Sequence, residues 1–148
     1  MSMTRNQALV RDFMERAFHQ GDLSAVDDFN APDGIDHQEP PGTDIVAHLK
    51  QIIVGMRAAF PDLHFEIHDM LAEGEIVAFR STMTGTHLGA LNFVPGRNLP
   101  PTGRSVSVPH MHFVRIVDGK TTDLWHLWNI PMMMLQLGGA AVPEIDHH

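Results

Sequence analysis

A histidine between two tryptophans, His126, is the residue of this chain best suited to acid–base chemistry. Trp125 and Trp128 flank it in a run rich in Thr, Leu and Trp. Aromatic walls bury an imidazole, and burial disfavours its charged form, which leaves a neutral ring able to accept a proton. Such a ring suits a general base near neutral pH. The alternative is a core histidine that is hydrogen-bonded to a backbone carbonyl.

Two further histidines lie in the segment "SVSVPHMHFVRIV", where His110 and His112 are two residues apart. Side chains alternate along a strand, so the two imidazoles are expected on one face. The Asp118-Gly119 turn joins this strand to the one that carries His126, and strands joined by a tight turn pair directly. His112 and His126 are similarly far from the turn, so we expect them to be near neighbours across the sheet.

The same histidines raise the alternative of a metal site. "HMH" offers two imidazoles, and His126 or His37 would supply a third. Three histidines and an open position are a known zinc arrangement. In a chain with 11 histidines, however, the spacing alone fixes no coordination geometry. We predict no metal and no cofactor.

Composition narrows the class of protein. The chain has 148 residues, which predicts a single domain over residues 1–148, with a core of about 4–138 and a tail of 139–148. A net charge of −8 with only 10 Lys and Arg argues against nucleic acid or a membrane as partner. The chain has no cysteine. We find no signal-peptide pattern and no apolar run long enough to span a membrane, so we expect a cytoplasmic protein that binds a small molecule.

The order of the predicted elements indicates an α+β fold. Helical spacing of apolar residues covers about 4–20 and 43–60, and a short helix covers about 23–29. A loop rich in breakers follows the short helix, with an extended piece around 35–37. Alternating or apolar runs then predict strands at about 63–68, 76–87, 106–117 and 121–130, before a closing helix from Pro131. Helices followed by sequential strands with tight turns predict a mainly antiparallel sheet.

Nearly the whole chain resembles a known family. The stretches "MRAAFPDLHFEIHDMLAEGEIVAFRSTMTGTHLG" and "PPTGRSVSVPHMHFVRIVDGK", a Trp-centred strand and "LQLG" closely resemble the SnoaL-like polyketide cyclase (ester cyclase) family of the NTF2-like superfamily. The resemblance runs from about residue 10 to residue 138. The order AFPD, GTH, PTG, R-x-x-DGK, W, QLG is specific for the family and much less specific for any one substrate.

The resemblance implies a cone in which N-terminal helices and a strongly curved sheet enclose a pocket. It also implies a homo-oligomer, commonly a dimer through the sheet, and an intramolecular aldol condensation without a cofactor. In the cyclases an acidic group on the last strand removes a proton from an activated carbon, and nearby polar groups hold the enolate.

Carried over without gaps, the catalytic acid of the family falls on His126, where the cyclases have Asp. His112 falls on a pocket histidine of the family, and His37 lies near a polar loop position that faces the pocket. Many relatives carry an acid four positions after the Trp, and here that residue is Asn129. Histidine can still act as a base, with a higher intrinsic pKa, whereas asparagine cannot.

These observations predict a SnoaL-like enzyme of cyclase, lyase or isomerase type. His126 would be the base and His112 its polar partner or the group that stabilises the enolate. Arg80 lies in an apolar strand, His87 ends that strand, and His48 is expected at the surface of the second helix. The predicted substrate-binding residues are His37, Arg80, His87, His110, Trp125, Trp128 and Asn129. The alternatives are a pocket that binds a hydrophobic ligand without chemistry and a histidine-metal hydrolase or isomerase.

Overall fold

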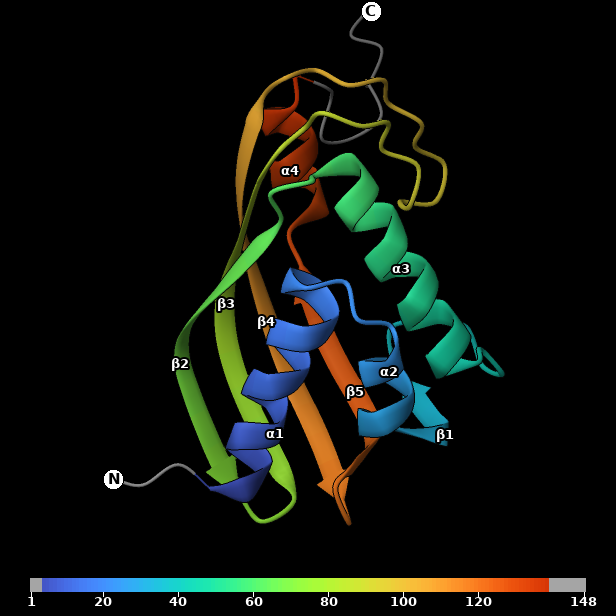
Figure 1. Cartoon of the computed structure of the whole chain (residues 1–148), viewed down its shortest axis with the longest axis vertical. Coiled ribbons are helices and arrows are strands. Elements are labelled where there is room, and N and C mark those ends of the chain that lie inside the picture. Colours follow the sequence, from blue (N-terminus) through green and yellow to red (C-terminus); the bar gives the residue numbers. More distant parts are fainter. Residues whose placement is uncertain (1–3, 139–148) are drawn as a thin grey trace, which may run out of the picture.

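The computed structural model describes residues 4–138, so the predicted tail of 139–148 lies outside the described residues. Five strands form one sheet in the order β1-β5-β4-β3-β2, and helices α1, α2 and α3 lie on one side of it (Figure 1). The helices are α1 (Arg5–Phe13), the π-helix η1 (Met14–His19), α2 (Ser24–Phe29), α3 (Ile45–Ala59) and α4 (Ile130–Gln136). The strands are β1 (Asn30–Asp36), β2 (His64–Glu73), β3 (Ile76–Thr86), β4 (Ser105–Val117) and β5 (Lys120–Trp128).

The first helix begins and ends where local chemistry dictates. Thr4 accepts a hydrogen bond from the backbone N–H of Gln7, and the Gln7 side chain accepts one from the backbone N–H of Thr4, which is a capping box. The second half of the predicted helix is the π-helix η1, whose wider turn lacks a sequence pattern of its own. The helical segment of α1 and η1 ends before Gly21, whose φ of +72° is readily adopted only by glycine.

The hairpin between β4 and β5 sets the register of the histidines. Asp118 and Gly119 both have positive φ, 50° and 78°, as a two-residue type I′ turn requires. Beyond that turn the register shifts by one residue between Arg115 and Ile116, and it then places His112 directly opposite His126. The predicted neighbourhood of these two residues is therefore confirmed.

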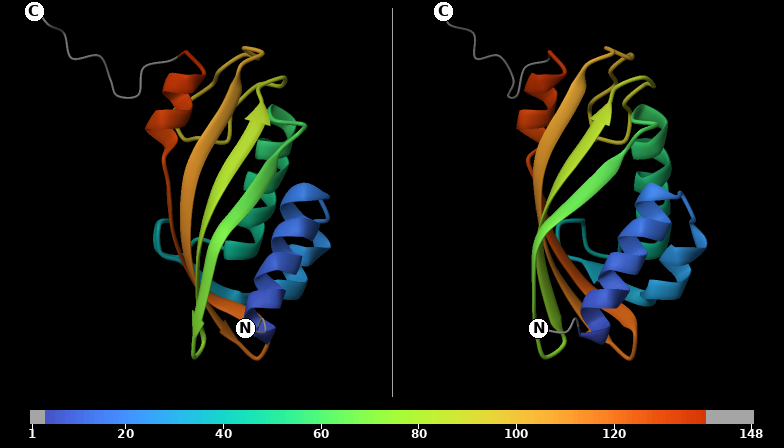
Figure 2. Two further views of the ribbon diagram at one scale, coloured as in Figure 1. Left: turned by 90° about the vertical axis from the view of Figure 1, so that its left-hand side faces the viewer. Right: turned by 60° about the vertical axis from the view of Figure 1, so that its left-hand side comes forward.

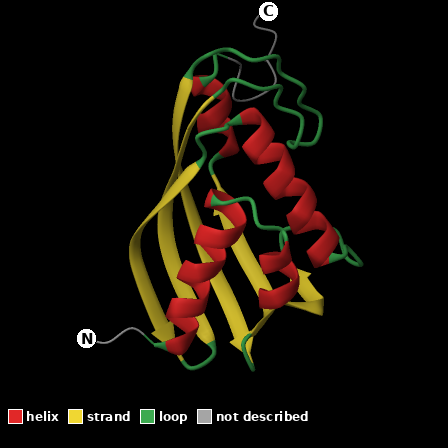
Figure 3. Ribbon diagram, in the orientation of Figure 1, coloured by secondary structure: helices red, strands yellow, loops and turns green. Residues whose placement is uncertain are grey.

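The fold is α+β, as predicted. Its sheet is curved, with the concave face toward the helices (Figure 2, Figure 3). Strands β2 to β5 are antiparallel, as predicted, whereas β1 runs parallel to β5 and makes the sheet mixed. The sequence showed only a short extended piece here because β1 contains Pro32 and Gly34 and has an irregular register. Proline is tolerated in such an edge strand because the edge needs fewer ladder hydrogen bonds.

The core lies between the concave face and the helices. Inward residues of β3 and β4 alternate with exposed ones, as the period of two predicts. Apolar residues of α1, α3 and α4 pack against them. Within residues 4–138 no helix is both long and apolar enough to cross a bilayer.

Candidate active site

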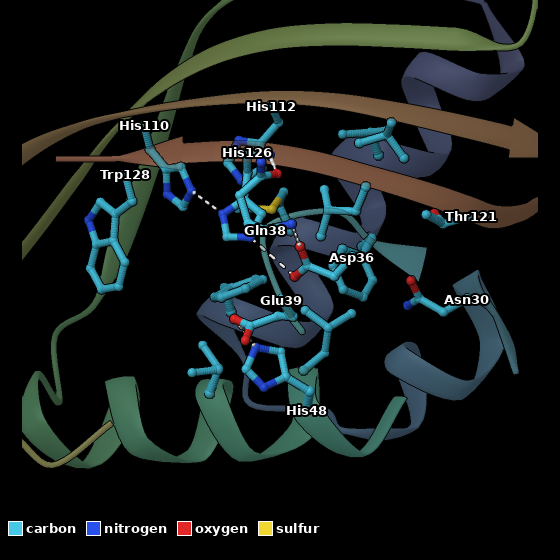
Figure 4. A pocket seen from close by; sticks show the side chains of 18 of the residues that line it. Asn30, Asp36, Gln38, Glu39, His48, His110, His112, Thr121, His126 and Trp128 are labelled. Atoms are coloured by element: carbon cyan, nitrogen blue, oxygen red, sulfur yellow. Dashed lines mark hydrogen bonds and ion pairs between the residues drawn. The ribbon is translucent and has the colours of Figure 1, made fainter. Parts of the chain in front are cut away.

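A pocket of about 330 Å³ lies between the concave face of the sheet and helices α1, α2 and α3. This volume is at the lower end of the range typical for small-molecule sites. Apolar side chains make most of its wall, among them Leu9, Val10, Phe13, Ile52, Met56, Phe79, Phe93, Val114, Ile116, Leu124 and Trp128. Polar side chains gather in one region, where they point toward one another from the sheet and from α3 (Figure 4). Of the described residues that line the pocket, none is lysine or arginine.

The loop between β3 and β4 contributes one wall of the pocket. Phe93 of this loop stacks on Trp128 of β5, with ring centroids 5.7 Å apart and planes within 6°. The loop approaches α3 so closely that a Cβ at Gly55 would lie 2.8 Å from the Cβ of Phe93. A glycine in the middle of a helix costs stability, and here it allows the aromatic ring to reach the pocket.

His126 stands at the centre of the polar region. Its Nε2 is 3.2 Å from Oδ2 of Asp36, and its Nδ1 is 3.3 Å from Nε2 of His110. The backbone N–H of His126 donates to Oε1 of Gln38 at 2.8 Å. The side chain of His126 is 23% exposed, so it is held by protein contacts and still open toward the pocket.

Asp36 is the carboxylate that orients His126. Its side chain is only 1% exposed, and burial by itself raises the pKa of a carboxyl group. The hydrogen bond from His126, the attraction of its positive charge when it is protonated, and the backbone N–H of Gln38 together outweigh burial, so the pKa of Asp36 is lowered below its ordinary value. Asp36 is therefore a carboxylate, and the imidazole of His126 presents Nε2–H to it.

His110 and His112 are held in their neutral forms. Burial, followed by the charge of His126, lowers the pKa of His110 to about 3. Burial and the charges of its two neighbours lower the pKa of His112 well below the ordinary value. The His112 ring stacks on Phe79 with centroids 4.3 Å apart and on His110 with centroids 4.0 Å apart. In the described part of the chain, Nδ1 of each of these histidines is buried without a hydrogen-bond partner.

A second acid–base pair lines the pocket opposite the histidines of the sheet. Nε2 of His48, on α3, is 3.0 Å from Oε1 of Glu39. His48 was expected at the surface, and that prediction is wrong because the chain segment after β1 folds over this part of α3. Glu39 follows β1 in a turn, where no pattern in the sequence marks it as a pocket residue.

The comparisons with known proteins agree with this geometry. A model of the family described as SnoaL-like polyketide cyclase matches residues 8–137. The chain belongs to the SnoaL-like polyketide cyclase family. Its five-stranded curved sheet and enclosed pocket are the NTF2-like fold that the sequence predicts for this family. No curated protein sequence matches the chain.

Solved structures show the same fold over nearly the full length. AclR of Streptomyces galilaeus, a candidate hydroxylase, is 30% identical, with a TM-score of 0.76 over 99% of this chain and 87% of AclR. IdmH of Streptomyces antibioticus, a candidate polyketide cyclase, is 28% identical, with a TM-score of 0.73 over 91% of this chain and 99% of IdmH. TsrD of Streptomyces laurentii, at 24% identity and a TM-score of 0.75 over 93% of this chain and 98% of TsrD, shares the fold.

Four of the residues predicted for the site line the pocket of this SnoaL-like chain. They are His110, His112, His126 and Trp128. His126, the residue on which the family resemblance places the catalytic acid, thus faces the cavity.

Two predicted residues lie on the opposite face of the sheet. Trp125 precedes His126 on β5, and adjacent strand residues point to opposite faces. His37 stacks on Trp125 with centroids 4.5 Å apart, and its Nε2 is 2.9 Å from Oδ2 of Asp123. Neither residue is part of the pocket lining, contrary to their predicted placement.

Three more predicted residues have other partners. Arg80 points outward from β3 and pairs with Asp69 at 2.8 Å. His87 is fully buried, and its Nδ1 accepts a hydrogen bond from the backbone N–H of Thr102. Asn129 caps α4, where its side chain accepts from the backbone N–H of Met132. The pocket lining includes none of the three, so their expected contact with substrate is corrected.

Sequence analysis missed Asp36, Gln38, Glu39 and His48. Asp36 ends the irregular strand β1, and Gln38 and Glu39 lie in the turn after it. The parallel pairing of β1 with β5 brings Asp36 beside Leu124 and hence near His126. A buried aspartate after a loop of breakers is a signal only once that pairing is known.

Proposed function

We propose that this protein catalyses proton abstraction from a carbonyl compound, with His126 as the base, as the first step of a polyketide-cyclase-type aldol condensation. The observation that carries the proposal is the hydrogen-bonded series Asp36–His126–His110 at the polar end of an apolar pocket.

The pairing of His126 with Asp36 suits His126 to act as a general base. In this step the substrate replaces the contact of Nδ1 of His126 with Nε2 of His110. When Nδ1 then takes a proton from carbon, the ring becomes an imidazolium beside the ionised Asp36. A buried carboxylate 3.2 Å away stabilises that charge, because attraction is strong where water is excluded. General-base catalysis of this kind accelerates a reaction by about a hundred- to ten-thousand-fold.

A neutral histidine beside the base can stabilise the enolate that proton abstraction forms. As negative charge develops on the carbonyl oxygen, a preorganised N–H in a dry site stabilises it. His112 is a neutral ring next to the base, and a neutral imidazole can donate one such hydrogen bond. The apolar wall selects a mostly hydrophobic substrate, and the absence of lysine and arginine from the described lining disfavours an anionic one.

Deuterium exchange tests the proton-abstraction step without knowledge of the true substrate. The probe is 2-acetonaphthone, a bicyclic aryl ketone with an exchangeable methyl group, and loss of its methyl signal in D₂O is followed by ¹H NMR. We expect the wild-type protein to accelerate exchange and His126→Gln to reduce that acceleration by about a hundred-fold or more. The matched control is His37→Gln on the outer face, which should exchange as the wild type does.

The alternative of a pocket that binds a ligand without chemistry makes a different prediction in the same experiment. The ketone signals would broaden on binding, while wild type and His126→Gln would exchange at equal rates. That result would overturn the role of His126.

A further inference from the structure

Three imidazoles converge on one point of the pocket. His110, His112 and His126 each place one ring nitrogen within 4.8 Å of the other two. The closest pair, Nε2 of His110 and Nδ1 of His126, is 3.3 Å apart. Zinc–nitrogen bonds of about 2.1 Å in a tetrahedral site put neighbouring ligand nitrogens about 3.4 Å apart. The pair from His110 and His126 therefore has the spacing of two ligands of one tetrahedral ion, and His112 places a third nitrogen within 4.8 Å of both.

The surroundings of the cluster also suit a cation. The rings of His110, His112 and His126 stack against one another in the wall of the pocket, with centroids 4.0 Å apart for His110 and His112 and 5.9 Å apart for His112 and His126. Buried polar atoms without a partner are uncommon in proteins. In residues 4–138, Nδ1 of His110 and Nδ1 of His112 are in that position. Nε2 of His110 has Nδ1 of His126 as its partner.

Asp36 completes the arrangement. A metal-bound histidine almost always gives its other ring N–H to a carboxylate, carbonyl or water, which fixes its tautomer. Nε2 of His126 faces Oδ2 of Asp36 at 3.2 Å, so Nδ1 of the same ring faces the cluster. The second polar group, Asp36 with Glu39 and His48, has less to offer an ion, because Glu39 and His48 pair with each other at 3.0 Å.

We propose that His110, His112 and His126 bind one divalent transition-metal ion of the Zn²⁺ and Co²⁺ class, and that this ion competes with the proton for Nδ1 of His126. The competition rests on the proposed function, whereas the metal site does not. An ion at this position inhibits proton abstraction, since a nitrogen that holds a metal has no lone pair left for a proton.

Cobalt titration of the metal-free protein tests the site. We expect one equivalent of Co²⁺ to bind with the intense visible absorption of a four-coordinate ion, and Zn²⁺ to displace it. His126→Asn and His112→Asn should each lose the bands. His48→Asn is the matched control and should keep them. Absence of the bands in the wild type, or equal bands in His126→Asn, which would indicate a surface histidine site, overturns the proposal.

Two measurements keep the result interpretable. Circular dichroism establishes that each variant is folded, and the conclusion depends on His126→Asn because this side chain is partly exposed and least needed for packing. Saturating Zn²⁺ should abolish deuterium exchange of 2-acetonaphthone, and EDTA should restore it. Exchange that continues under saturating Zn²⁺ overturns the competition alone. Cobalt bands in a protein that never exchanges the ketone overturn the proposed function alone.

Discussion

The two faces of the β4–β5 hairpin each carry a histidine bonded to an aspartate. On the inner face, His126 pairs with Asp36 at 3.2 Å. On the outer face, His37 pairs with Asp123 at 2.9 Å. By distance alone the two pairs are equivalent, and both join the segment of β1 to β5.

Their surroundings differ. The inner aspartate is 1% exposed and the outer one 17%, and the outer pair is further satisfied by Arg115, which donates to Asp123 at 3.2 Å. Trp125 covers one side of His37 by stacking. The inner pair instead adjoins two neutral imidazoles and an apolar cavity. A His–Asp hydrogen bond alone therefore does not make a candidate catalytic dyad. The inner pair is one because it is buried beside a cavity and next to histidines that have ring nitrogens without hydrogen-bond partners in the described residues.

The largest expected difference between the two pairs is the effect of replacing each aspartate on the rate of deuterium exchange. Asp36→Asn removes the charge that stabilises a protonated His126. Hydrogen bonds to charged groups contribute about 1.5–3 kcal/mol, so the exchange rate of 2-acetonaphthone should fall about tenfold to a hundredfold. Asp123→Asn should leave the rate unchanged. Equal losses in the ¹H NMR exchange assay would refute the distinction between the faces.

Lowering the pH should destabilise the metal-free protein, because His110 on the inner face of the sheet is buried as a neutral ring. The folded state holds the pKa of His110 at about 3, whereas an unfolded chain binds this proton with a pKa of about 6.5. Stability present above about pH 6.5 is therefore lost as the pH falls toward the folded value, by about 1.4 kcal/mol per pH unit for this one group. His112, whose pKa is lowered by burial, adds a loss of the same sign.

Urea unfolding between about pH 6.5 and pH 4.5 measures this slope, above the range in which the unfolded Asp36 carboxyl takes up its proton. His110→Phe should reduce the slope by about one proton. Met111→Ala, next to it on the outer face, changes the stability but should keep the slope. An unchanged slope in His110→Phe would show that this imidazole is not the titrating group.

The outer face should also carry a contact between two copies of the chain. Met111, Phe113 and Leu127 are more than half exposed there, and the family resemblance implies a dimer through the sheet. Burial of a phenylalanine contributes about 1.5–3 kcal/mol, so Phe113→Glu should weaken self-association at least about tenfold. Light scattering over a concentration series checks this. Thr122→Glu, near the start of the neighbouring strand β5, is the control, and a monomeric wild type would contradict the prediction.

The smallest expected effect is that of the outer pair on stability. Asp123→Asn should lower the free energy of unfolding by no more than about 1 kcal/mol at neutral pH, because its partners His37 and Arg115 are 33% and 42% exposed and water screens the pair. Asp36→Asn should cost more, about 1–3 kcal/mol, because it alters a buried hydrogen bond. Urea unfolding of the two variants compares them, and a larger loss for Asp123→Asn would reverse the assignment.

Local patterns determined most of the architecture. The turn at Asp118-Gly119 and the alternation in β4 and β5 predicted that His112 and His126 are near neighbours, since both depend only on local backbone geometry. Their direct pairing also requires the one-residue register shift between Arg115 and Ile116. The helices and four of the strands follow from the period of their apolar residues. The family motifs placed His126 at the position of the catalytic acid.

The tertiary structure decided which groups surround that histidine. Asp36, Glu39 and His48 reach the pocket from an irregular edge strand, its following turn and a helix far away in the chain. Such contacts depend on the parallel pairing of β1 with β5 and on the fold of the helices over the concave face, neither of which leaves a periodic signal in the sequence. For the same reason Arg80, His87 and Asn129, which the sequence offered as polar groups near the site, satisfy their hydrogen bonds elsewhere. The sequence shows which polar side chains the protein has. Their burial and their hydrogen-bond partners in the folded chain decide which of them face the pocket and which only stabilise the fold.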